Sequence, residues 1–501
     1  MARQSDRVRL DAEAATMHQV GNAEVNVPPM TTAASEGDHI ATDGSRQSPS
    51  VAAASSGTRV VPRIRHLMTT HVGRLHRDSL VRNSFFIMLT TIINSIFGFA
   101  FWLVAARTFP AHVVGLTAAL IAASTIAILL ASLGVGGTLI QSLPTKKDPG
   151  AWSLTFWAGM ATALVLSLAI GGVILILLPA FTAEFDTLRN PTYAFLLLFG
   201  TVALTVGTVI DYVFIAERSA GNMVVRNLVL SAGKVLLVVG LTVLAGSSGQ
   251  ALLGSWAASS LVGLCCGVVL LVRRAHPRRP PRLVAVVNAA IGLRGRLAGN
   301  QLIGMGASLL PFVLPLLVTS RLSPTENAYF YTTWMMAGVF LIISPAVSQA
   351  LFAEGAHSPH ELLSKGRNAL GVIGAILLPC IVGIIVLGGP LLSAFGAAYE
   401  EHAAGLLRIV VIASIPDAVS NVYVAIMRVQ GRLVTAACLN MGMGFGIIVF
   451  SWLCLPTMGI DAVGWGFLIV QLCGCVYVAV DLFWWSRRKG ALAPNAAGSA
   501  F

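Results

Sequence analysis

Residues 113–140 read VVGLTAALIAASTIAILLASLGVGGTLI, a continuous apolar stretch without a charged side chain. As an α-helix, which rises about 1.5 Å per residue, it is long enough to cross the roughly 30 Å of hydrocarbon in a bilayer. A helix also satisfies its backbone hydrogen bonds within the segment, as lipid requires. This stretch therefore predicts a transmembrane helix.

The rest of the chain has the same character. Its 501 residues are 56% hydrophobic and 11% charged, whereas soluble domains carry roughly 25% charged residues. Similar apolar segments cover 83–106, 113–140, 152–180, 193–215, 224–245, 251–272, 298–319, 329–352, 370–392, 404–427, 433–455 and 463–485. The sequence predicts an all-α polytopic membrane protein of about twelve transmembrane helices, without a large soluble domain.

The N-terminal residues 1–78 differ from everything that follows. They are rich in Ala, Ser, Thr and Gly and contain no apolar run, so we expect a disordered cytoplasmic tail. The stretch lacks the apolar core of a signal peptide. Two interpretations stay open: a genuine tail, or a start assigned too early, with translation beginning downstream, for instance at Met68.

Lys and Arg are distributed unevenly between alternate connections. Most of them, including Arg226, fall on one predicted side, and the other side has only Arg107, Arg189, Arg321 and Arg408. The positive-inside rule then predicts that both termini are cytoplasmic, in the cell inner (plasma) membrane. The net charge of +12 is explained by this topology, and no nucleic acid is expected as a partner, because no basic stripe with interleaved aromatics is present.

The seven cysteines predict no chemistry of their own. All lie within or at the ends of apolar segments, where neither a disulfide framework nor a zinc site is expected. The sequence therefore predicts no metal and no cofactor.

An internal repeat divides the chain. LVAARTFPAHVVGLTAALIAA, from Leu103, aligns with LVTSRLSPTENAYFYTTWMMA, from Leu317, and DYVFIAERSAG, from Asp211, aligns with NVYVAIMRVQG, from Asn421. An even number of spans per half keeps both halves in one orientation, which predicts two six-helix lobes in a parallel repeat. Such lobes suit alternating access around a site near the midplane.

These features predict the following domains: residues 79–272 and 298–486 as the lobes, 273–297 as a basic cytoplasmic linker, and 487–501 as a cytoplasmic C-terminal tail. The apolar middle of the linker, 283–293, fits either an interfacial amphipathic helix or part of a solvated connector. We favour the connector.

At three stretches the sequence resembles a known family. They are AARTFPAHVVGLTAALIAASTIAILLASLGVGGTLIQSLP from Ala105, DYVFIAERSAG from Asp211, and SPAVSQALFAEG from Ser344. The chain from about Asp78 onward resembles the polysaccharide-transporter branch of the multidrug/oligosaccharidyl-lipid/polysaccharide (MOP) exporter superfamily, which includes O-antigen flippase-like proteins. The resemblance implies an inner-membrane flippase for a polyprenyl-pyrophosphate-linked oligosaccharide. Lipid II flippases form a sister group, usually with two additional spans that this chain lacks.

Lys234 is the leading candidate for substrate binding. It lies about midway along the predicted span 224–245, roughly 16 Å from either surface at about 1.5 Å per residue. A lysine cannot reach the interface from that depth, and a charge in lipid costs several kcal/mol. We expect it to face the central cavity and attract a substrate phosphate. The alternative is a structural ion pair between helices.

Two carboxylates are candidates for coupling or gating. Asp417 lies near the midplane after Pro416, which can break its helix, so it either binds a coupling cation, partners Lys234, or caps a broken helix. Asp211 is nearer the cytoplasmic surface, where a structural or gating role is expected.

Other polar residues in apolar surroundings complete the predicted site. Arg408 either meets the glycan or anchors at the headgroups. Sugar hydroxyls are candidate partners of Asn94, Asn300, Gln301 and Tyr423, although bonds between helices are the commoner use of such residues.

The sequence thus predicts a non-enzymatic flippase for a lipid-linked glycan, with membrane lipid and polysaccharide polymerase or export machinery as possible partners. A cation-coupled multidrug exporter is the alternative within the transporter class, although a midplane lysine weighs against it. A scaffold or a membrane glycosyltransferase of glycan assembly is the alternative from another class, but the connections offer no gathered acids, bases or metal ligands.

Overall fold

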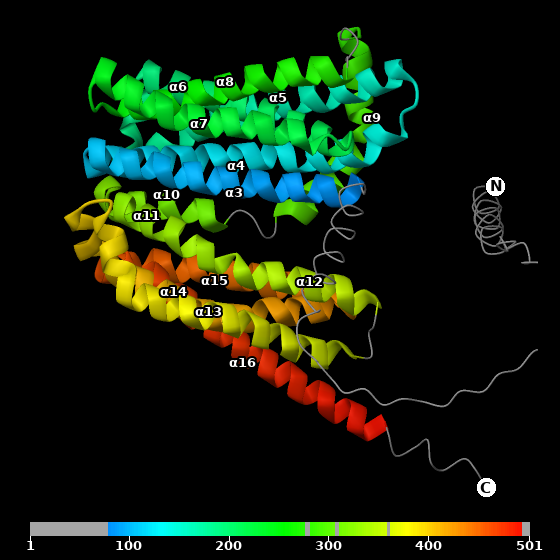
Figure 1. Ribbon diagram of the computed structural model, residues 1–501, viewed down its shortest axis with the longest axis vertical. Helices are drawn as coiled ribbons and strands as arrows, with labels where there is room; N and C mark the ends of the chain where they lie inside the picture. Colours follow the sequence, from blue (N-terminus) through cyan, green and yellow to red (C-terminus); the bar gives the residue numbers. More distant parts are fainter. Residues whose placement is uncertain (1–78, 276–280, 306–309, 358–360, 493–501) are drawn as a thin grey trace, which may run out of the picture. The chain divides into compact units, whose positions relative to one another are not determined.

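The computed structural model describes residues 79–275, 281–305, 310–357 and 361–492. The predicted N-terminal tail and residues 493–501 of the predicted C-terminal tail lie outside these ranges, whereas residues 487–492 of that tail are the end of the last helix. The described residues form helices and short connections (Figure 1). Eleven helical segments within them are long and apolar enough to cross a membrane. The prediction of a polytopic all-α membrane protein is confirmed, and the count lies close to the expected twelve.

The first lobe contains six long helices. They are α3 (Ser79–Thr108), α4 (Ala111–Ser142), α5 (Pro149–Phe181), α6 (Pro191–Ala216), α7 (Ala220–Ala245) and α8 (Gly249–Ala275). Side chains of Asp148 and Asn190 accept hydrogen bonds at the N-termini of α5 and α6, each of which begins with a proline. These caps explain why the helices begin where they do, since a first-turn proline needs no backbone partner.

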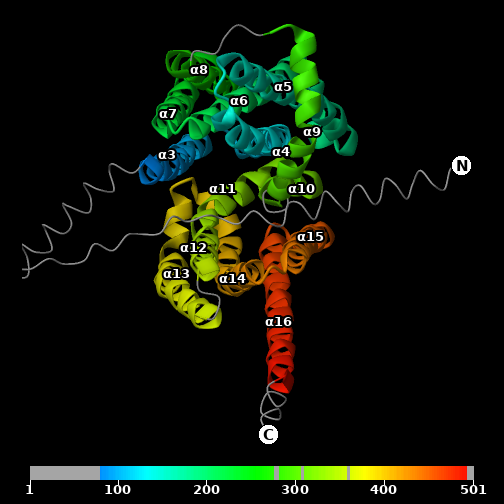
Figure 2. The ribbon, with the colours of Figure 1, turned by 90° about the vertical axis from the view of Figure 1, so that its right-hand side faces the viewer.

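The second lobe is built around α14 (Ala397–Val429), which is the most deeply buried of the candidate spans. The other helices of this half of the chain are α10 (Leu310–Arg321), α11 (Pro324–Leu341), α12 (Ile343–His357), α13 (Leu362–Ser393), α15 (Leu433–Met458) and α16 (Asp461–Leu492). Helices α11, α12, α13 and α16 pack against α14. Figures 1 and 2 show the two lobes as separate groups of helices.

The structure describes the seventh predicted span in two parts, 298–305 and 310–319. Helix α9 (Leu283–Met305) takes in the middle of the predicted linker and the beginning of that span, and α10 follows as a short helix. Residues 283–293, for which we favoured a solvated connector over an interfacial amphipathic helix, are helical and form the first part of α9. Helix α9 packs against α4 and α5, so the basic connection is attached to the first lobe (Figure 2).

The eighth span bends between α11 and α12. A one-residue turn at Ile342 separates the two helices, and Pro345 lies in the first turn of α12. Because proline has no N–H, the carbonyl of Leu341 loses its usual helical partner at this point. The bend directs α12 along α13 and α14, where it forms one wall of the cavity described below.

The lobes meet where α4 packs against α10 and α11. The Asn327 amide donates a hydrogen bond to the carbonyl of Gly115 at 2.8 Å, and Asn327 is fully buried. Arg107, at the end of α3, donates to the carbonyls of Ala394 (2.6 Å) and Ser393 (3.1 Å) at the end of α13. All these contacts lie at the side that the distribution of basic residues assigns to the outside.

Candidate functional site

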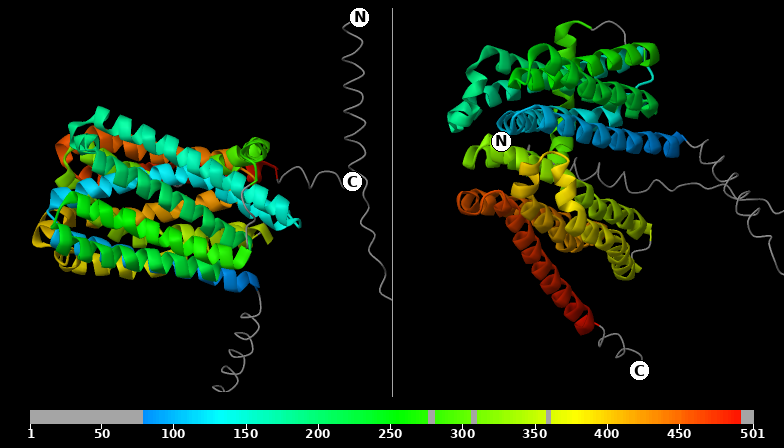
Figure 3. Two further views of the ribbon diagram at one scale, coloured as in Figure 1. Left: turned by 90° about the horizontal axis from the view of Figure 1, so that it is seen from above. Right: turned by 60° about the vertical axis from the view of Figure 1, so that its left-hand side comes forward.

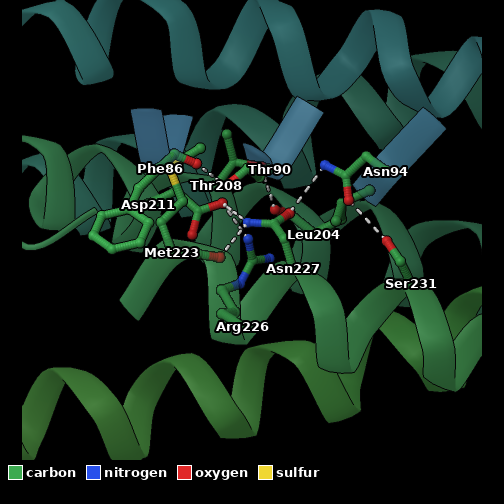
Figure 4. A network of polar contacts seen from close by, with 10 residues as sticks. All are labelled: Phe86, Thr90, Asn94, Leu204, Thr208, Asp211, Met223, Arg226, Asn227 and Ser231. Atoms are coloured by element: carbon green, nitrogen blue, oxygen red, sulfur yellow. Dashed lines mark hydrogen bonds and ion pairs between the residues drawn. The ribbon is translucent and has the colours of Figure 1, made fainter. Parts of the chain in front are cut away.

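A buried polar network joins α3, α6 and α7 in the first lobe (Figure 4). The Arg226 guanidinium donates to the Asp211 carboxylate, which also accepts from the Asn227 amide at 2.9 Å. Arg226 is only 1% exposed. Its side chain lies against Gly207 and Gly267, where any Cβ would crowd it. The sequence interpretation that placed Arg226 in a basic cytoplasmic connection is wrong, because it is the internal counter-ion of Asp211.

The network continues along α7 toward the membrane midplane. The Asn94 amide of α3 donates to the Asn227 oxygen at 3.3 Å and accepts from the Ser231 hydroxyl at 2.8 Å (Figure 4). Asn94 therefore joins two helices, which is the commoner use of a polar residue in a membrane. Its side chain nevertheless remains exposed.

Lys234 follows Ser231 on the same face of α7. Its ammonium lies 5.2 Å from the ring centroid of Phe101 in α3, close enough for a cation–π contact. At 3.6 residues per turn, the exposed apolar side chains Leu236, Val239 and Val243 lie on the opposite face. Lys234 therefore points away from the exposed apolar face of α7.

No carboxylate pairs with Lys234 within the part of the chain that the structure describes. The first lobe thus contains two very different cations. Arg226 is used by an internal ion pair, and Lys234 has only an aromatic ring beside it. The structural ion pair that the sequence left open for Lys234 does not form among the described residues.

The second lobe contains a polar cavity of about 390 Å³ between α12, α14, α15 and α16. Asp417 lines it and is 8% exposed. Its carboxylate accepts from the Asn421 amide at 2.9 Å and from the Gln471 amide at 3.0 Å. Among the described residues no cation pairs with it, so the predicted partnership with Lys234 is not formed.

Two further oxygens at this cavity have no hydrogen-bond partner among the described residues. They are the hydroxyl of Ser348 and the amide oxygen of Gln471, and both are buried. Together with Asp417 they present acceptor groups to one space. Such a set suits a proton or a small cation.

Pro416 does not break its helix. Helix α14 runs without interruption from Ala397 to Val429, with Pro416 inside it. The alternative role of Asp417 as the cap of a broken helix is therefore wrong. The cavity arises from the packing of four helices instead.

The remaining predicted residues do not gather in one place. Gln301 accepts a hydrogen bond from the backbone of Gly134 at 2.7 Å, and the Asn300 amide lies 3.3 Å from the Thr138 hydroxyl, so both attach α9 to α4. Arg408 is exposed and lies on the opposite face of α14 from Asp417, since nine residues separate them.

Tyr423 is part of a separate contact between α14 and α16. Its hydroxyl donates to the Asp481 carboxylate at 2.7 Å. Arg432 bonds both oxygens of that carboxylate, at 2.9 and 3.1 Å, and this hydrogen bonding raises the pKa of Arg432 above its usual value. Tyr423 is buried, so these bonds orient helices, and the predicted contact with sugar hydroxyls finds no support here.

Sequence reasoning missed the partners of the two carboxylates. Arg226 could have been identified, because an aspartate within an apolar span needs a counter-ion and the next helix supplies one basic residue close to its beginning. The amides of Asn421 and Gln471 carry no comparable signal, since neutral polar residues recur throughout the spans.

Comparison with known protein families gives one match. The family profile described as "Polysaccharide biosynthesis protein" matches residues 80–286, which cover the first lobe. A search of curated protein sequences finds no match.

Several solved structures have the same fold. An inward-facing multidrug-resistance MATE transporter of the MOP superfamily aligns with a TM-score of 0.61 at 17% identity, over 82% of this chain and 99% of that one. The lipid II flippase MurJ, in an inward closed conformation, gives 0.64 at 10% identity, over 79% and 87%. A MOP-superfamily transporter from Pyrococcus furiosus gives 0.51 at 17% identity, over 83% and 96%. These matches confirm the predicted fold class, which this chain shares with solved structures of MOP-superfamily transporters.

Proposed function

We propose that this chain is a flippase that moves a polyprenyl-pyrophosphate-linked glycan from the cytoplasmic to the outer leaflet by alternating access. The fold that it shares with MOP-superfamily structures and the polysaccharide-biosynthesis profile support this proposal. Both termini and the basic connections would lie in the cytoplasm. Glycan polymerase or export machinery would receive the product. The observation that carries this proposal is that no carboxylate pairs with the Lys234 ammonium among the described residues.

An ammonium at the depth of Lys234 costs several kcal/mol unless something compensates its charge. Asp211 is already occupied by Arg226, and no other described carboxylate pairs with Lys234. A pyrophosphate would supply the missing counter-charge during transport, and Phe101 would hold the ammonium in place meanwhile. Electrostatic attraction would then favour an anionic headgroup over neutral lipids.

Asp417 would serve the same cycle in the other lobe. Its carboxylate is held by two amides without a cation among the described residues, in a cavity with further acceptor oxygens. Binding of a proton or a sodium ion there would change the charge of the lobe. We propose that Asp417 couples such a cation to the movement of the lobes.

The same carboxylate favours a second candidate function. A cation-coupled multidrug exporter would use Asp417 in place of Lys234, and MATE transporters share this fold at 17% identity. The two functions differ in the charge of the substrate, which makes them separable by experiment.

The test uses the full chain in proteoliposomes with a fluorescent polyprenyl-pyrophosphate oligosaccharide. We expect wild-type protein to flip this lipid, and Lys234→Ala to reduce the rate at least about tenfold, the effect of losing roughly 1.4 kcal/mol of attraction. Lys234→Arg should keep part of the rate because it keeps the charge. Lys147→Ala is the matched control, since Lys147 lies exposed in a connection.

The opposite results are equally informative. Flipping that is unaffected in Lys234→Ala would remove Lys234 from the site. No flipping of any glycan lipid by wild type, together with proton-coupled efflux of organic cations, would identify the exporter instead.

A further inference from the structure

An open apolar groove of about 570 Å³ lies between α15 and α16. Val434, Leu439 and Met443 form its α15 side, and Val470 and Tyr477 form its α16 side. Figure 3 shows α16 diverging from the rest of its lobe toward its C-terminal end. This divergence leaves the N-terminal part of α15 and the facing part of α16 incompletely packed.

Two glycines line the groove, and one of them leaves it open. They are Gly442 and Gly474, and a Cβ at Gly442 would meet no other atom within 4 Å. The space beside Gly442 is therefore open. Exposed apolar side chains surround the groove, among them Val434, Met441 and Val476. Such a surface in a membrane-spanning helix pair contacts lipid chains.

The groove shares a wall with the polar cavity of Asp417. Met443 lines both spaces. A Cβ at Gly474 would lie 2.8 Å from the Met443 sulfur and 3.3 Å from the Ser420 hydroxyl, so the backbone of α16 closes the same boundary. Methionine adapts its shape readily, which suits a wall beside a flexible ligand.

The polar side of this wall includes a cation. Arg428 lines the cavity together with Asn421 and Asn440, and its guanidinium lies 4.3 Å from the ring centroid of Phe352. A polar space with a guanidinium next to a long apolar groove matches an amphiphile with an anionic headgroup and an apolar chain.

The groove also lies at a definite depth. Helix α15 begins at Leu433, directly after a basic connection that contains Arg432 and follows Arg428 in the last turn of α14. This basic connection belongs to the side assigned to the cytoplasm. The groove therefore opens toward the chains of the cytoplasmic leaflet, from which a substrate of the proposed flippase is loaded.

We propose that the α15–α16 groove binds the polyprenyl chain of the transported lipid-linked glycan. This inference rests on the proposed function, and adds a site that recognises the lipid carrier separately from the headgroup. The chain lies along Leu439, Met443 and Val470, beside Gly442. Selectivity for long polyprenyl carriers then arises in the groove, and selectivity for the anionic headgroup arises elsewhere.

The test compares two fluorescent substrates that share one pyrophosphate-oligosaccharide headgroup, one with a long polyprenyl chain and one with a short, ten-carbon isoprenoid chain. The variant Gly442→Phe adds an aromatic side chain to the groove at a position where a Cβ meets no protein atom within 4 Å. The control Gly371→Phe places the same side chain at an exposed glycine of α13 that also has open space and lines neither cavity.

We expect Gly442→Phe to raise the apparent KM for the long-chain substrate about tenfold, as the loss of roughly two buried methylene groups would. Transport of the short-chain substrate should not change, and Gly371→Phe should resemble wild type with both. Unchanged transport of the long-chain substrate by Gly442→Phe, or an equal loss with both substrates, would overturn the groove while leaving the proposed function intact. Failure of wild type to flip either substrate would overturn the proposed function itself.

A second measurement identifies the occupant. Cys438 and Cys473 line the groove and are exposed, so the rate of their alkylation by a maleimide reports its occupancy. The long-chain glycan lipid should protect them at concentrations where phosphatidylglycerol does not. Equal protection by phosphatidylglycerol would show a site for ordinary membrane lipid and would overturn the proposal.

Discussion

Arg226 and Asp211 form the one strongly buried ion pair among the described residues, and they test how charge is tolerated inside the first lobe. Removal of Arg226 would leave the Asp211 carboxylate without a counter-ion, a loss that costs about 3–5 kcal/mol in buried pairs. We expect Arg226→Met to lower the unfolding midpoint in detergent strongly. The double variant Arg226→Met/Asp211→Leu should recover much of that loss, because no charge stays unpaired.

Thermal unfolding of the two single variants and the double variant measures this coupling. Additive effects would show that the pair contributes no mutual stabilisation. Transport by the double variant provides a second readout. Loss of transport in a protein that is stable again would mean that Asp211 takes part in gating, as the sequence suggested.

The charged residues of the candidate site could be predicted from the sequence, but the side chains that contact them could not. Lys234 and Asp417 stand out in any reading of the spans, since each interrupts a long apolar run. Depth alone left an ion pair between them open, because sequence does not specify which faces of α7 and α14 look at each other. Asn94, Asn300 and Gln301 show the same limit, since all three bond neighbouring helices.

Among the elements, α4 and α11 make the closest contact between the lobes. A Cβ at Gly115 would overlap the carbonyl of Pro324 in the first turn of α11, and it would also displace the bond from Asn327. We expect Gly115→Ala to destabilise the protein by about 1–3 kcal/mol, the usual cost of forced overpacking. Unfolding midpoints in detergent measure this effect.

Gly172→Ala in α5 is the matched control, since nothing lies within 4 Å of a Cβ there. An alanine in an open helical position should be neutral or slightly stabilising. Similar midpoints for the two variants would mean that α4 and α11 separate easily and that their contact adds little to stability.

The elements also show where span prediction succeeds and where it fails. Long uniform runs such as 113–140 became single helices, because in lipid the backbone has no better alternative. The turn at Ile342 was missed. Pro345 is a signal for the bend, but Pro416 is a similar signal and leaves α14 continuous, so proline alone does not decide.

For the whole molecule, the repeat predicted two lobes but not how its equivalent residues are used. Arg107 and Arg321 align in the two halves. In the structure Arg107 reaches across to the end of α13, whereas the Arg321 guanidinium lies 4.4 Å from the ring centroid of Trp452 within its own lobe. Equivalent residues of the repeat therefore make different contacts in the two halves.

Arg107 therefore joins the lobes at the side assigned to the outside. The alternating access that we propose would require that this contact break. Its guanidinium bonds two carbonyls at the C-terminal end of α13, where a cation is also favoured by the helix dipole. We expect Arg107→Ala to open this side more often. Amide hydrogen exchange should then rise about fivefold in residues 110–116 and 392–397, as a net loss of about 1 kcal/mol from these exposed bonds would give.

Arg189→Ala provides the control, because Arg189 lies on the same side and pairs with Asp186 in its own connection, at 2.8 Å. It should leave exchange in both segments unchanged. If Arg107→Ala exchanges like wild type, the closure of this side depends on the α4–α11 contact alone. If exchange rises and flipping slows, transport needs both the conformation closed on this side and the conformation open on it. A variant that favours one of these conformations depletes the other.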